Sequence, residues 1–445
     1  MAANADALRE ATFAIPVGFE PASDPVLADA KHAWHAAQEA VEALLPAKRE
    51  LLRHFDPPGM TRAAALCHCS RSGSLLLASY FDGHPDVVTL PLLCGEHIYR
   101  FHARYPQLSA WERLIVFPSF AAHTNPVEGD LFQMLGRADY YAGVQALYER
   151  YGTEEAAWLD SRRRFFQFLH AAFALGTGAV PATPRPLMLY AQHWVDADLA
   201  QRFVEDFPDA QFVHTIRDPI TAIDSWFDRQ TQLYLGEAGG RPEHAPYLNP
   251  AASAVLSFLA WDHPHRGLEA RSRAVRFEDM HLAPDALMRR LAAWLKIADD
   301  PCLRQSTWLG KPYVVEVGGV PWCGPNPANA ARRSRNLTAA DRLVLFALLN
   351  ENFRTWSYPS PRFLRPVWVR LALLAVLCWV PLGLEIKNAR LVLERQARPA
   401  LRERRFAYAC GALLFPLRRR ARIMAGLALD TLLRVTRRRL PLERL

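Results

Sequence analysis

Four short apolar runs have the length and composition of buried strands. They are AAALC at 63–67, LMLYA at 187–191, QFVHTI at 211–216 and RAVRFE at 273–278. Segments with apolar residues at helical spacing separate these runs. Strands that alternate with helices are typical of a parallel sheet wound with helices, so the pattern predicts an α/β fold.

Helical patterns also occur outside this alternation. Residues 27–55 predict N-terminal helices interrupted at Pro46, because proline disfavours a helix interior. Residues 110–182, rich in aromatic residues and helix formers, predict a helical layer. We therefore expect an N-terminal helical segment at 1–60, an α/β domain at 61–360 and a helical C-terminal extension at 361–445.

The positive charge is concentrated in the C-terminal extension. Residues 365–445 hold 18 Lys and Arg against 5 Asp and Glu, a net charge of +13, whereas residues 1–364 have a net charge of −5. A body that bound nucleic acid would itself be basic, so we expect no nucleic-acid partner. The basic tail is instead expected to contact an anionic surface.

Cysteine usage indicates reduced thiols and no metal. Seven cysteines, an odd number, are scattered from Cys67 to Cys410, which argues against a disulfide framework. No second CxxC or HxxxH completes a ligand set with Cys67 and Cys69, and small residues on a buried strand account for both. The N-terminus has acidic residues and lacks the basic and apolar regions of a secretory signal peptide.

The loop after the first apolar run has the features of an anion site. In CSRSGSLLLASYF, Arg71, Ser72, Gly73 and Ser74 separate the strand from a helical segment. Backbone N–H groups at a helix start, with the positive end of the helix dipole behind them, bind anions. A nucleoside-triphosphate P-loop would read GxxxxGK[ST]; this loop is shorter and has no lysine, which disfavours a metal-dependent kinase.

This loop resembles one from a known family. Arg71-Ser72-Gly73-Ser74, followed by Asp82-Gly83-His84-Pro85, is similar to the RSGTTLL and LDAHP phrases of sulfotransferases that use 3′-phosphoadenosine 5′-phosphosulfate (PAPS), in the branch with bacterial, tyrosylprotein and carbohydrate enzymes. The resemblance implies a P-loop-like parallel sheet flanked by helices. It also implies that the phosphosulfate is held by Arg71, Ser72, Gly73, Ser74, Leu75 and Leu76.

A second segment matches the family's contacts to the 3′-phosphate. In FPDAQFVHTIRDPITAIDSWF, Arg217 opens an Arg-Asp-Pro turn after a strand, and Ser225 follows eight residues later. An arginine at a strand end and a serine two turns into the next helix can converge on one phosphate, the arginine through a charge-assisted fork. The resemblance implies that Arg217 and Ser225 bind the 3′-phosphate of the nucleotide.

The resemblance extends over about 63–358. VRFED at 275–279 and the segment 307–326 are similar to later family motifs, and Arg332, Arg333 and Arg335 fall where the family often has a basic lid residue. For each of these arginines a solvated basic loop is the alternative.

Two positions depart from the family: Leu75 replaces a Thr or Ser, and no lysine occurs near 192–194, where the family has one.

Glu96 and His97, in CGEHIYR, are the candidate general bases for the acceptor hydroxyl. Glu96 matches the first acid of a CGEE-like phrase in tyrosylprotein-type members, and His97 falls opposite the second. The alternative is that one of the two forms a surface ion pair with Arg100. The next candidates are His68, His193 and His214, although core packing also accounts for His214; His84 is interpreted as a structural ring hydrogen-bonded to a turn.

The C-terminal tail has the pattern of a membrane-surface segment. Leu371–Leu384 is an uncharged, mostly apolar run of 14 residues broken by Pro381, whereas a spanning helix needs about 20. Apolar and arginine-rich blocks then alternate, which is typical of interfacial helices, with Trp368 or Trp379 at the boundary. The alternative is a helical hairpin packed on the domain with its arginines solvated.

Taken together, the sequence predicts a PAPS-dependent sulfotransferase that modifies an acceptor hydroxyl, with PAPS as co-substrate and no metal. We expect it in the cytoplasm, peripheral on the inner face of an anionic membrane, where a lipid or lipid-linked acceptor would be favoured. The helical layer would cover the acceptor side. The alternatives are a non-catalytic membrane-associated binding protein that retains the fold, and a nucleotide or sugar kinase.

Overall fold

The computed structural model describes most of the chain. The described residues are 15, 24–68, 72–90, 95–124, 135–153, 161–193, 197–226, 264, 267–317, 320–330, 337–364, 366, 368–369, 372–373, 383, 386, 389–390, 393–411, 414, 421 and 442–445.

A six-stranded parallel sheet flanked by helices confirms the predicted fold class. The strand order is β10-β5-β4-β1-β3-β2. The bounds are β1 Arg62–His68, β2 Val87–Thr89, β3 Leu187–His193, β4 Gln211–Ile216, β5 Ser272–Arg276 and β10 Glu443–Arg444. Residues 63–67 of β1 are at most 1% exposed, as expected for a strand covered on both faces.

The four apolar runs match strands of this sheet, with one difference in length. β1, β3 and β4 lie where the sequence predicts them, but β5 ends at Arg276, and Phe277 and Glu278 begin a helix, α12 (Phe277–Leu282). The pattern did not indicate β2 or β10. These are short strands, of three and two residues, and such lengths leave little periodic signal.

The chain divides into two compact units. Unit 1 comprises Met1–Cys67, Ser74–Val213 and Pro284–Gly324; unit 2 comprises His68–Gly73, His214–Ala283 and Pro325–Leu445. The sequence-based domain limits at 60 and 360 stay predictions.

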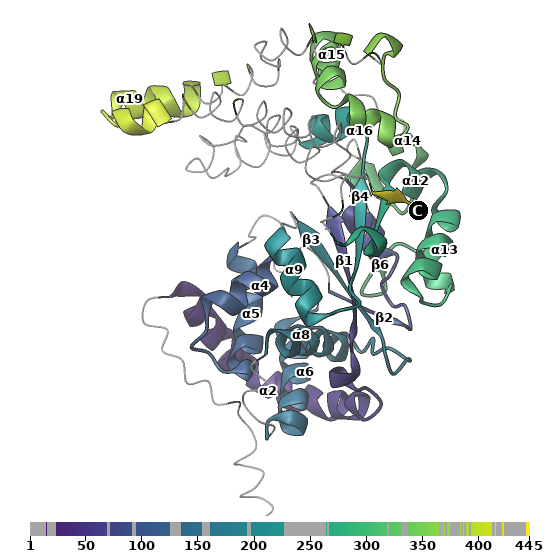
Figure 1. Ribbon diagram of the computed structural model, residues 1–445. Helices are drawn as coiled ribbons and strands as arrows, with labels where there is room; N and C mark the ends of the chain where they lie inside the picture. The colour runs from purple at the N-terminus through teal and green to yellow at the C-terminus, as the bar shows by residue number, and fades with distance from the viewer. Residues whose placement is uncertain are drawn as a thin grey trace, which may run out of the picture. The chain divides into compact units, whose positions relative to one another are not determined.

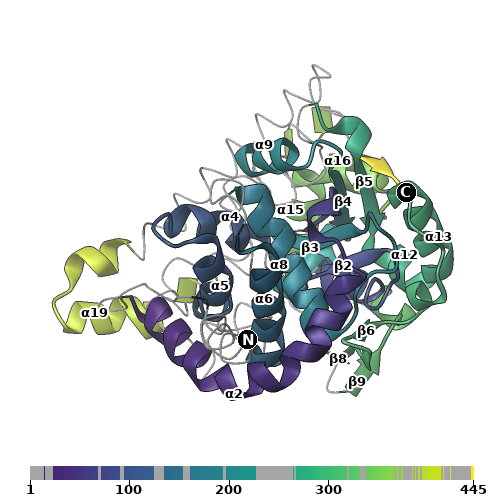
Figure 2. The ribbon, with the colours of Figure 1, turned by 90° about the horizontal axis from the view of Figure 1, so that it is seen from below.

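Unit 1 contains the predicted helical layer. Its helices are α2 Pro25–Arg53, α3 Ser74–Ser79, α4 Gly95–Arg104, α5 Ala110–Thr124, α6 Arg137–Tyr151, α8 Arg162–Thr177, α9 Ala197–Asp206 and α13 Pro284–Leu295. The N-terminal helix α2 packs against α5, α6 and α8 (Figure 2). Two antiparallel hairpins complete the unit: β6 (Thr307–Trp308) with β7 (Lys311–Pro312), and β8 (Val314–Val317) with β9 (Val320–Cys323).

The predicted interruption at Pro46 is wrong, because α2 runs through it. Asp24 caps the helix by accepting a hydrogen bond from the Val26 N–H at 2.9 Å. Pro25 occupies the first turn, where a backbone N–H would have no partner within the helix, so its missing N–H costs no hydrogen bond. Pro46 removes one hydrogen bond to the carbonyl of Glu42. Both residues are exposed, so water can satisfy that carbonyl.

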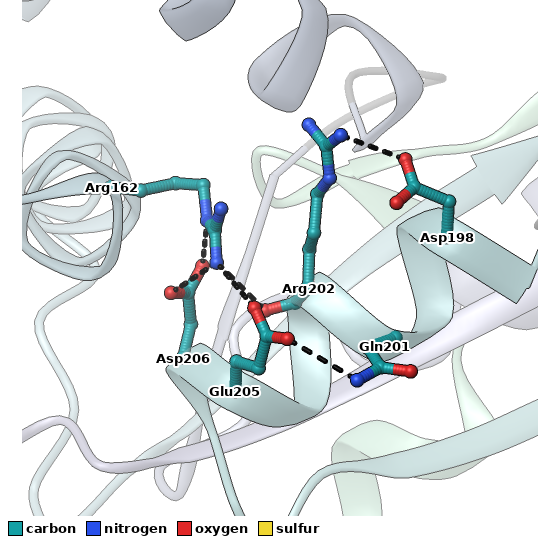
Figure 3. Close-up of polar contacts among 6 residues, drawn as sticks. All are labelled: Arg162, Asp198, Gln201, Arg202, Glu205 and Asp206. Carbon is teal, nitrogen blue, oxygen red and sulfur yellow. Dashed lines mark hydrogen bonds and ion pairs between the residues drawn. The ribbon is translucent and has the colours of Figure 1, made fainter.

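Aromatic rings and the ion pairs of Arg162 with Asp206 and Glu205 hold α8 against its neighbours. The ring of Phe166 lies 5.1 Å from that of Tyr190 in β3 and 5.8 Å from that of Phe203 in α9. At the start of the helix, Arg162 donates two hydrogen bonds to the Asp206 carboxylate of α9, at 2.6 and 2.9 Å (Figure 3). Its guanidinium also lies over the Tyr99 ring of α4, 5.4 Å from the centroid. These contacts orient α4, whose first turn carries Glu96 and His97.

Unit 2 contains α12 and a series of short helices. They are α14 Pro327–Ala330, α15 Ala339–Leu348, α16 Asn350–Thr355, η5 Arg362–Leu364, the π-helical turn η6 Leu393–Ala397 and α19 Arg398–Arg402 (Figure 1). No helix in the described part of the chain combines the length and the apolar character needed to cross a membrane.

Candidate functional site

The predicted strand and helix lie on either side of the candidate anion loop, of which residues 72 and 73 are described. β1 ends at His68 and α3 begins at Ser74. Arg71 lies outside the described residues, whereas Ser72 and Ser74 are buried, Leu76 is buried and Leu75 is half-buried. The Ser72 hydroxyl shares a hydrogen bond of 2.5 Å with the Thr215 hydroxyl. This bond joins the loop to β4, the strand that leads to Arg217.

Gly73 occupies a position that only glycine suits. Its φ is +85°, in the left-handed region, and a Cβ built there would lie 2.6 Å from Cδ2 of Phe277. The side chain of Phe277 therefore packs directly against the loop backbone. No other residue type would satisfy both the backbone angle and this contact.

Arg217 is buried at the end of β4 and has defined partners. It is 6% exposed, and its guanidinium carbon lies 4.1 Å from the centroid of the Phe277 ring. Its Nε donates to the Thr221 hydroxyl at 3.2 Å. Thr221 and Ser225 lie one turn apart in helical residues 219–226, so they share a helix face. Arg217 thus contacts the helix face on which Ser225 also lies, and Ser225 is buried.

The Arg-Asp-Pro turn is held by hydrogen bonds from both sides. The Asp218 carboxylate accepts from the Thr221 N–H at 3.0 Å and caps the following helix, while the Asp218 N–H donates to the Glu278 carboxylate at 3.1 Å. Tyr358 donates its hydroxyl to the other Glu278 oxygen at 2.7 Å. Burial, together with the nearby Glu278, raises the pKa of Asp218. The turn is therefore fixed by α12 as well as by its own helix.

His281 extends this arrangement as a neutral ring. Its Nδ1 accepts from the Asn326 N–H at 2.9 Å, so the ring proton is on Nε2. Its ring lies 4.4 Å from that of Phe277 in an edge-on arrangement. Burial, with a smaller contribution from the Arg217 charge, lowers the pKa of His281 to about 4. Arg217 is therefore the cation of this pair at neutral pH.

Sequence reasoning missed several of these contributors. Phe277, Glu278 and His281 lie in or just after the VRFED segment, which carried the resemblance but to which we assigned no role. Thr221 could have been found from its spacing, since it lies four residues after Arg217 and four before Ser225 on one helix face. Thr215 gave no signal, because only the tertiary fold brings it to Ser72.

In unit 1, two segments that resemble the family contact each other. The Asp82 carboxylate accepts from the Thr307 hydroxyl and from the Gly310 N–H, each at 2.9 Å. The structural interpretation of His84 is confirmed: it is 2% exposed, its Nδ1 accepts from the Asp86 N–H and its Nε2 donates to the Ala298 carbonyl, each at 3.0 Å. The Asp-Gly-His-Pro phrase thus holds the chain around 298–310.

The remaining candidate residues stay predictions. Glu96 and His97 lie in the first turn of α4, but their side chains are outside the described residues, as are those of His68 and His193. Arg332, Arg333 and Arg335 also lie outside them. His214 is 4% exposed within β4, in agreement with core packing.

Cys67 is a buried residue of β1, as the sequence indicated. Burial raises the pKa of its thiol well above the ordinary range, so the sulfur stays protonated at neutral pH. Cys69 lies outside the described residues. Within the part of the chain that is described, no group of three or more His, Cys, Asp or Glu residues is arranged to hold a metal ion.

A loop at a helix start, joined to a buried arginine at the end of the neighbouring strand, defines an α/β protein with a candidate anion site. Comparison with known proteins gives the family. Residues 67–301, more than half of the chain, match the model of the sulfotransferase family. The chain belongs to the sulfotransferase family.

The chain is also similar to solved structures of sulfotransferases. The sulfotransferase domain from the curacin biosynthetic pathway is 17% identical, with 67% of this chain and 99% of that chain covered and a TM-score of 0.36. The sulfotransferase domain of the Synechococcus PCC 7002 olefin synthase is 18% identical, with 69% and 99% covered and a TM-score of 0.38.

Sulfotransferase STF9 from Mycobacterium avium is 16% identical, with 77% of this chain and 89% of that chain covered and a TM-score of 0.34. No curated protein matches the chain. Because these identities and TM-scores are low, the family assignment rests on the match over residues 67–301.

The contact between Gly73 and Phe277 can be tested by a pair of glycine substitutions. Gly73→Ala and Gly83→Ala each force alanine to a positive φ, +85° and +71°, but a Cβ at Gly83 meets nothing within 4 Å. We expect Gly83→Ala to lower the free energy of unfolding by about 1–2 kcal/mol, and Gly73→Ala by about 1–3 kcal/mol more because of overpacking. Urea unfolding measures both.

A second change separates the clash from the backbone strain. Phe277→Leu in the Gly73→Ala background removes ring atoms near the new methyl group, so the double variant should lose less than the sum of the two single changes. Equal losses for Gly73→Ala and Gly83→Ala would show that Phe277 does not constrain the loop.

Proposed function

We propose that the protein transfers a sulfuryl group from PAPS to an acceptor hydroxyl. One observation carries this proposal: the Ser72–Thr215 hydrogen bond joins the anion-binding loop to the strand that ends at the buried Arg217. A nucleotide with phosphates on both its 5′ and 3′ carbons has one anionic group for the loop and another for Arg217. ATP has no 3′-phosphate for Arg217 and Ser225.

The described residues fit the 3′-phosphate. Arg217 is buried and positively charged, and the Thr221 and Ser225 hydroxyls lie on the helix face along which its side chain runs. Around the turn, the Asp218 carboxylate caps its own helix and the Glu278 carboxylate accepts two hydrogen bonds. A guanidinium and two hydroxyls on one helix face are groups of the kind that bind a phosphate.

The loop would neutralise charge on the group that is transferred. PAPS supplies a sulfuryl group bonded to a phosphate oxygen. Arg71 and the backbone N–H groups of Ser72, Gly73, Ser74, Leu75 and Leu76 would bind its oxygens, and they would stabilise the charge that develops as the S–O bond to the phosphate breaks.

In the reaction, the acceptor oxygen bonds to sulfur, the acceptor proton passes to a general base and 3′,5′-ADP leaves. We assign Glu96 or His97 as that base, because both lie in the first turn of α4, a helix oriented by Arg162. Arg332 would add a positive charge near the nucleotide. No step in this scheme needs a metal.

We further propose that the tail binds an anionic membrane surface on the cytoplasmic face and that the acceptor is a lipid or lipid-linked hydroxyl. Of the nine exposed large hydrophobic residues in the described part of the chain, six lie between 363 and 414; these are Phe363, Trp368, Ile386, Leu401, Phe406 and Leu414. Four exposed arginines, Arg398, Arg402, Arg404 and Arg405, occur in the same region. Exposed aromatic and aliphatic side chains next to arginines suit a membrane interface.

Nucleotide binding tests the proposed function. Arg217→Lys keeps the positive charge but loses the pair of guanidinium N–H groups that can bind one phosphate together, and Ser225→Ala removes one hydroxyl. Each change should weaken 3′,5′-ADP binding by about 1.5–3 kcal/mol. Calorimetry on these variants, with Arg290→Ala on the exposed face of α13 as control, measures the effect. Unchanged affinity in Arg217→Lys and Ser225→Ala would contradict the site.

The same titrations on the unaltered protein separate the alternatives. Preference for 3′,5′-ADP over ATP supports the sulfotransferase. Magnesium-dependent ATP binding would instead favour a nucleotide or sugar kinase. The absence of any nucleotide binding would favour a non-catalytic protein that retains the fold.

The general base is tested by Glu96→Gln and His97→Gln, made separately. One of them should lower kcat by about 100-fold or more, because a positioned base contributes that much, while 3′,5′-ADP affinity stays unchanged. Transfer from PAPS is followed by mass spectrometry of the product. Near-normal rates in both variants would shift the assignment to His68 or His193.

Membrane binding is tested by changing Arg398, Arg402, Arg404 and Arg405 to Gln together. At about 1 kcal/mol for each arginine near an anionic surface, the variant should bind vesicles of phosphatidylcholine and phosphatidylglycerol up to about 1,000-fold more weakly at low salt. Arg289→Gln with Arg290→Gln, two exposed arginines of α13, is the matched control. Equal sedimentation of all three proteins with the vesicles would exclude this role.

A further inference from the structure

The C-terminus of the chain returns to the sheet of unit 2. Glu443 and Arg444 form β10, which pairs in parallel with β5 in the register Glu443 to Arg273 and Arg444 to Ala274 (Figure 2). The Leu445 N–H donates to the Ala274 carbonyl at 3.0 Å, and Leu442 is 4% exposed. A strand of two residues is thereby held by backbone pairing and by burial of the residue before it.

Two ion pairs fix this short strand to β5 and α12. Glu443 lies 3.0 Å from the Arg273 guanidinium, and Arg444 lies 2.8 Å from the Asp279 carboxylate. Asp279 belongs to α12 and its side chain is 17% exposed, so the second pair is partly shielded from water. Each charged residue of β10 therefore pairs with a residue of opposite charge on β5 or α12.

These two elements also support the candidate site. β5 leads directly into α12, and α12 carries Phe277 against Gly73 and Arg217, and Glu278 against the backbone of Asp218. Asp279, the partner of Arg444, is the next residue. A shift of α12 would thus alter contacts of Arg217 and of the loop together.

The described residues on either side of 365–441 are both attached to unit 2. Leu364 is fully buried, and Leu442 is buried beside β10. Between them, the Gly383 N–H donates to the Asp341 carboxylate, which also accepts from the N–H of Thr338, the N-cap of α15. The basic tail is therefore connected to the body at both of its ends.

We propose that residues 442–445 are a positioning element of the nucleotide site, which makes the affinity of that site depend on the docked C-terminus. The nucleotide part of this inference rests on the proposed function. The docking itself does not.

Truncation and charge exchange test the inference. A chain that ends at residue 441, and Arg444→Glu, should both lose amide protection over 272–279 in hydrogen exchange and bind 3′,5′-ADP about tenfold more weakly, a loss comparable to one charge-assisted hydrogen bond. Arg444→Glu combined with Asp279→Arg restores an ion pair of opposite polarity and should recover both properties. Arg354→Glu, in an exposed ion pair with Glu351 of the same unit, is the control.

The outcomes are distinct. Unchanged exchange over 272–279 in the truncated chain would overturn the docking. Lost protection with unchanged affinity, or no recovery in the exchanged pair, would overturn the positioning role. If the full chain binds no 3′,5′-ADP, the proposed function fails, and the exchange data still decide whether the C-terminus is docked.

Discussion

The packing of Phe277 is the contact on which the candidate site depends. One ring touches the backbone of Gly73, the guanidinium of Arg217 and the ring of His281. The attraction between a cation and an aromatic face is stronger when the pair is shielded from water, and Arg217 is almost fully buried. The loop and the arginine are therefore positioned by the same side chain, at the first residue of α12.

This arrangement explains how a buried arginine can be tolerated before a ligand is bound. Burial of an unpaired charge is costly. Arg217 has the Phe277 face and the Thr221 hydroxyl, and the neutral state of His281 avoids a second positive charge beside it. Asp218 and Glu278 bond to other groups around the turn.

The sequence anticipated much of the fold and only part of the site. Buried parallel strands are nearly continuous apolar runs, so β1, β3 and β4 could be located from composition. The loop after β1, and Arg217 with Ser225, became candidates because their order and spacing along the chain resemble the family's motifs. His84 could be interpreted as structural for a similar reason, since its partner Asp86 is two residues away. Thr215 and Phe277 had no such signal, because their partners are distant in sequence.

What the sequence determined by itself was the set of local features: the positions of the longer strands, the candidate anion loop, the Arg-Asp-Pro turn and the concentration of arginine in the tail. The tertiary structure decided which of these lie together. The helix α2 continues through Pro46, where the residue that loses its hydrogen bond, Glu42, is exposed, so that water can bind its carbonyl. β10 was added to the sheet because the exposed edge of β5 offers unpaired backbone groups and Asp279 offers a charge to Arg444. A two-residue strand has too little periodicity to be recognised alone, and its stability comes almost wholly from residues more than 160 positions earlier in the chain.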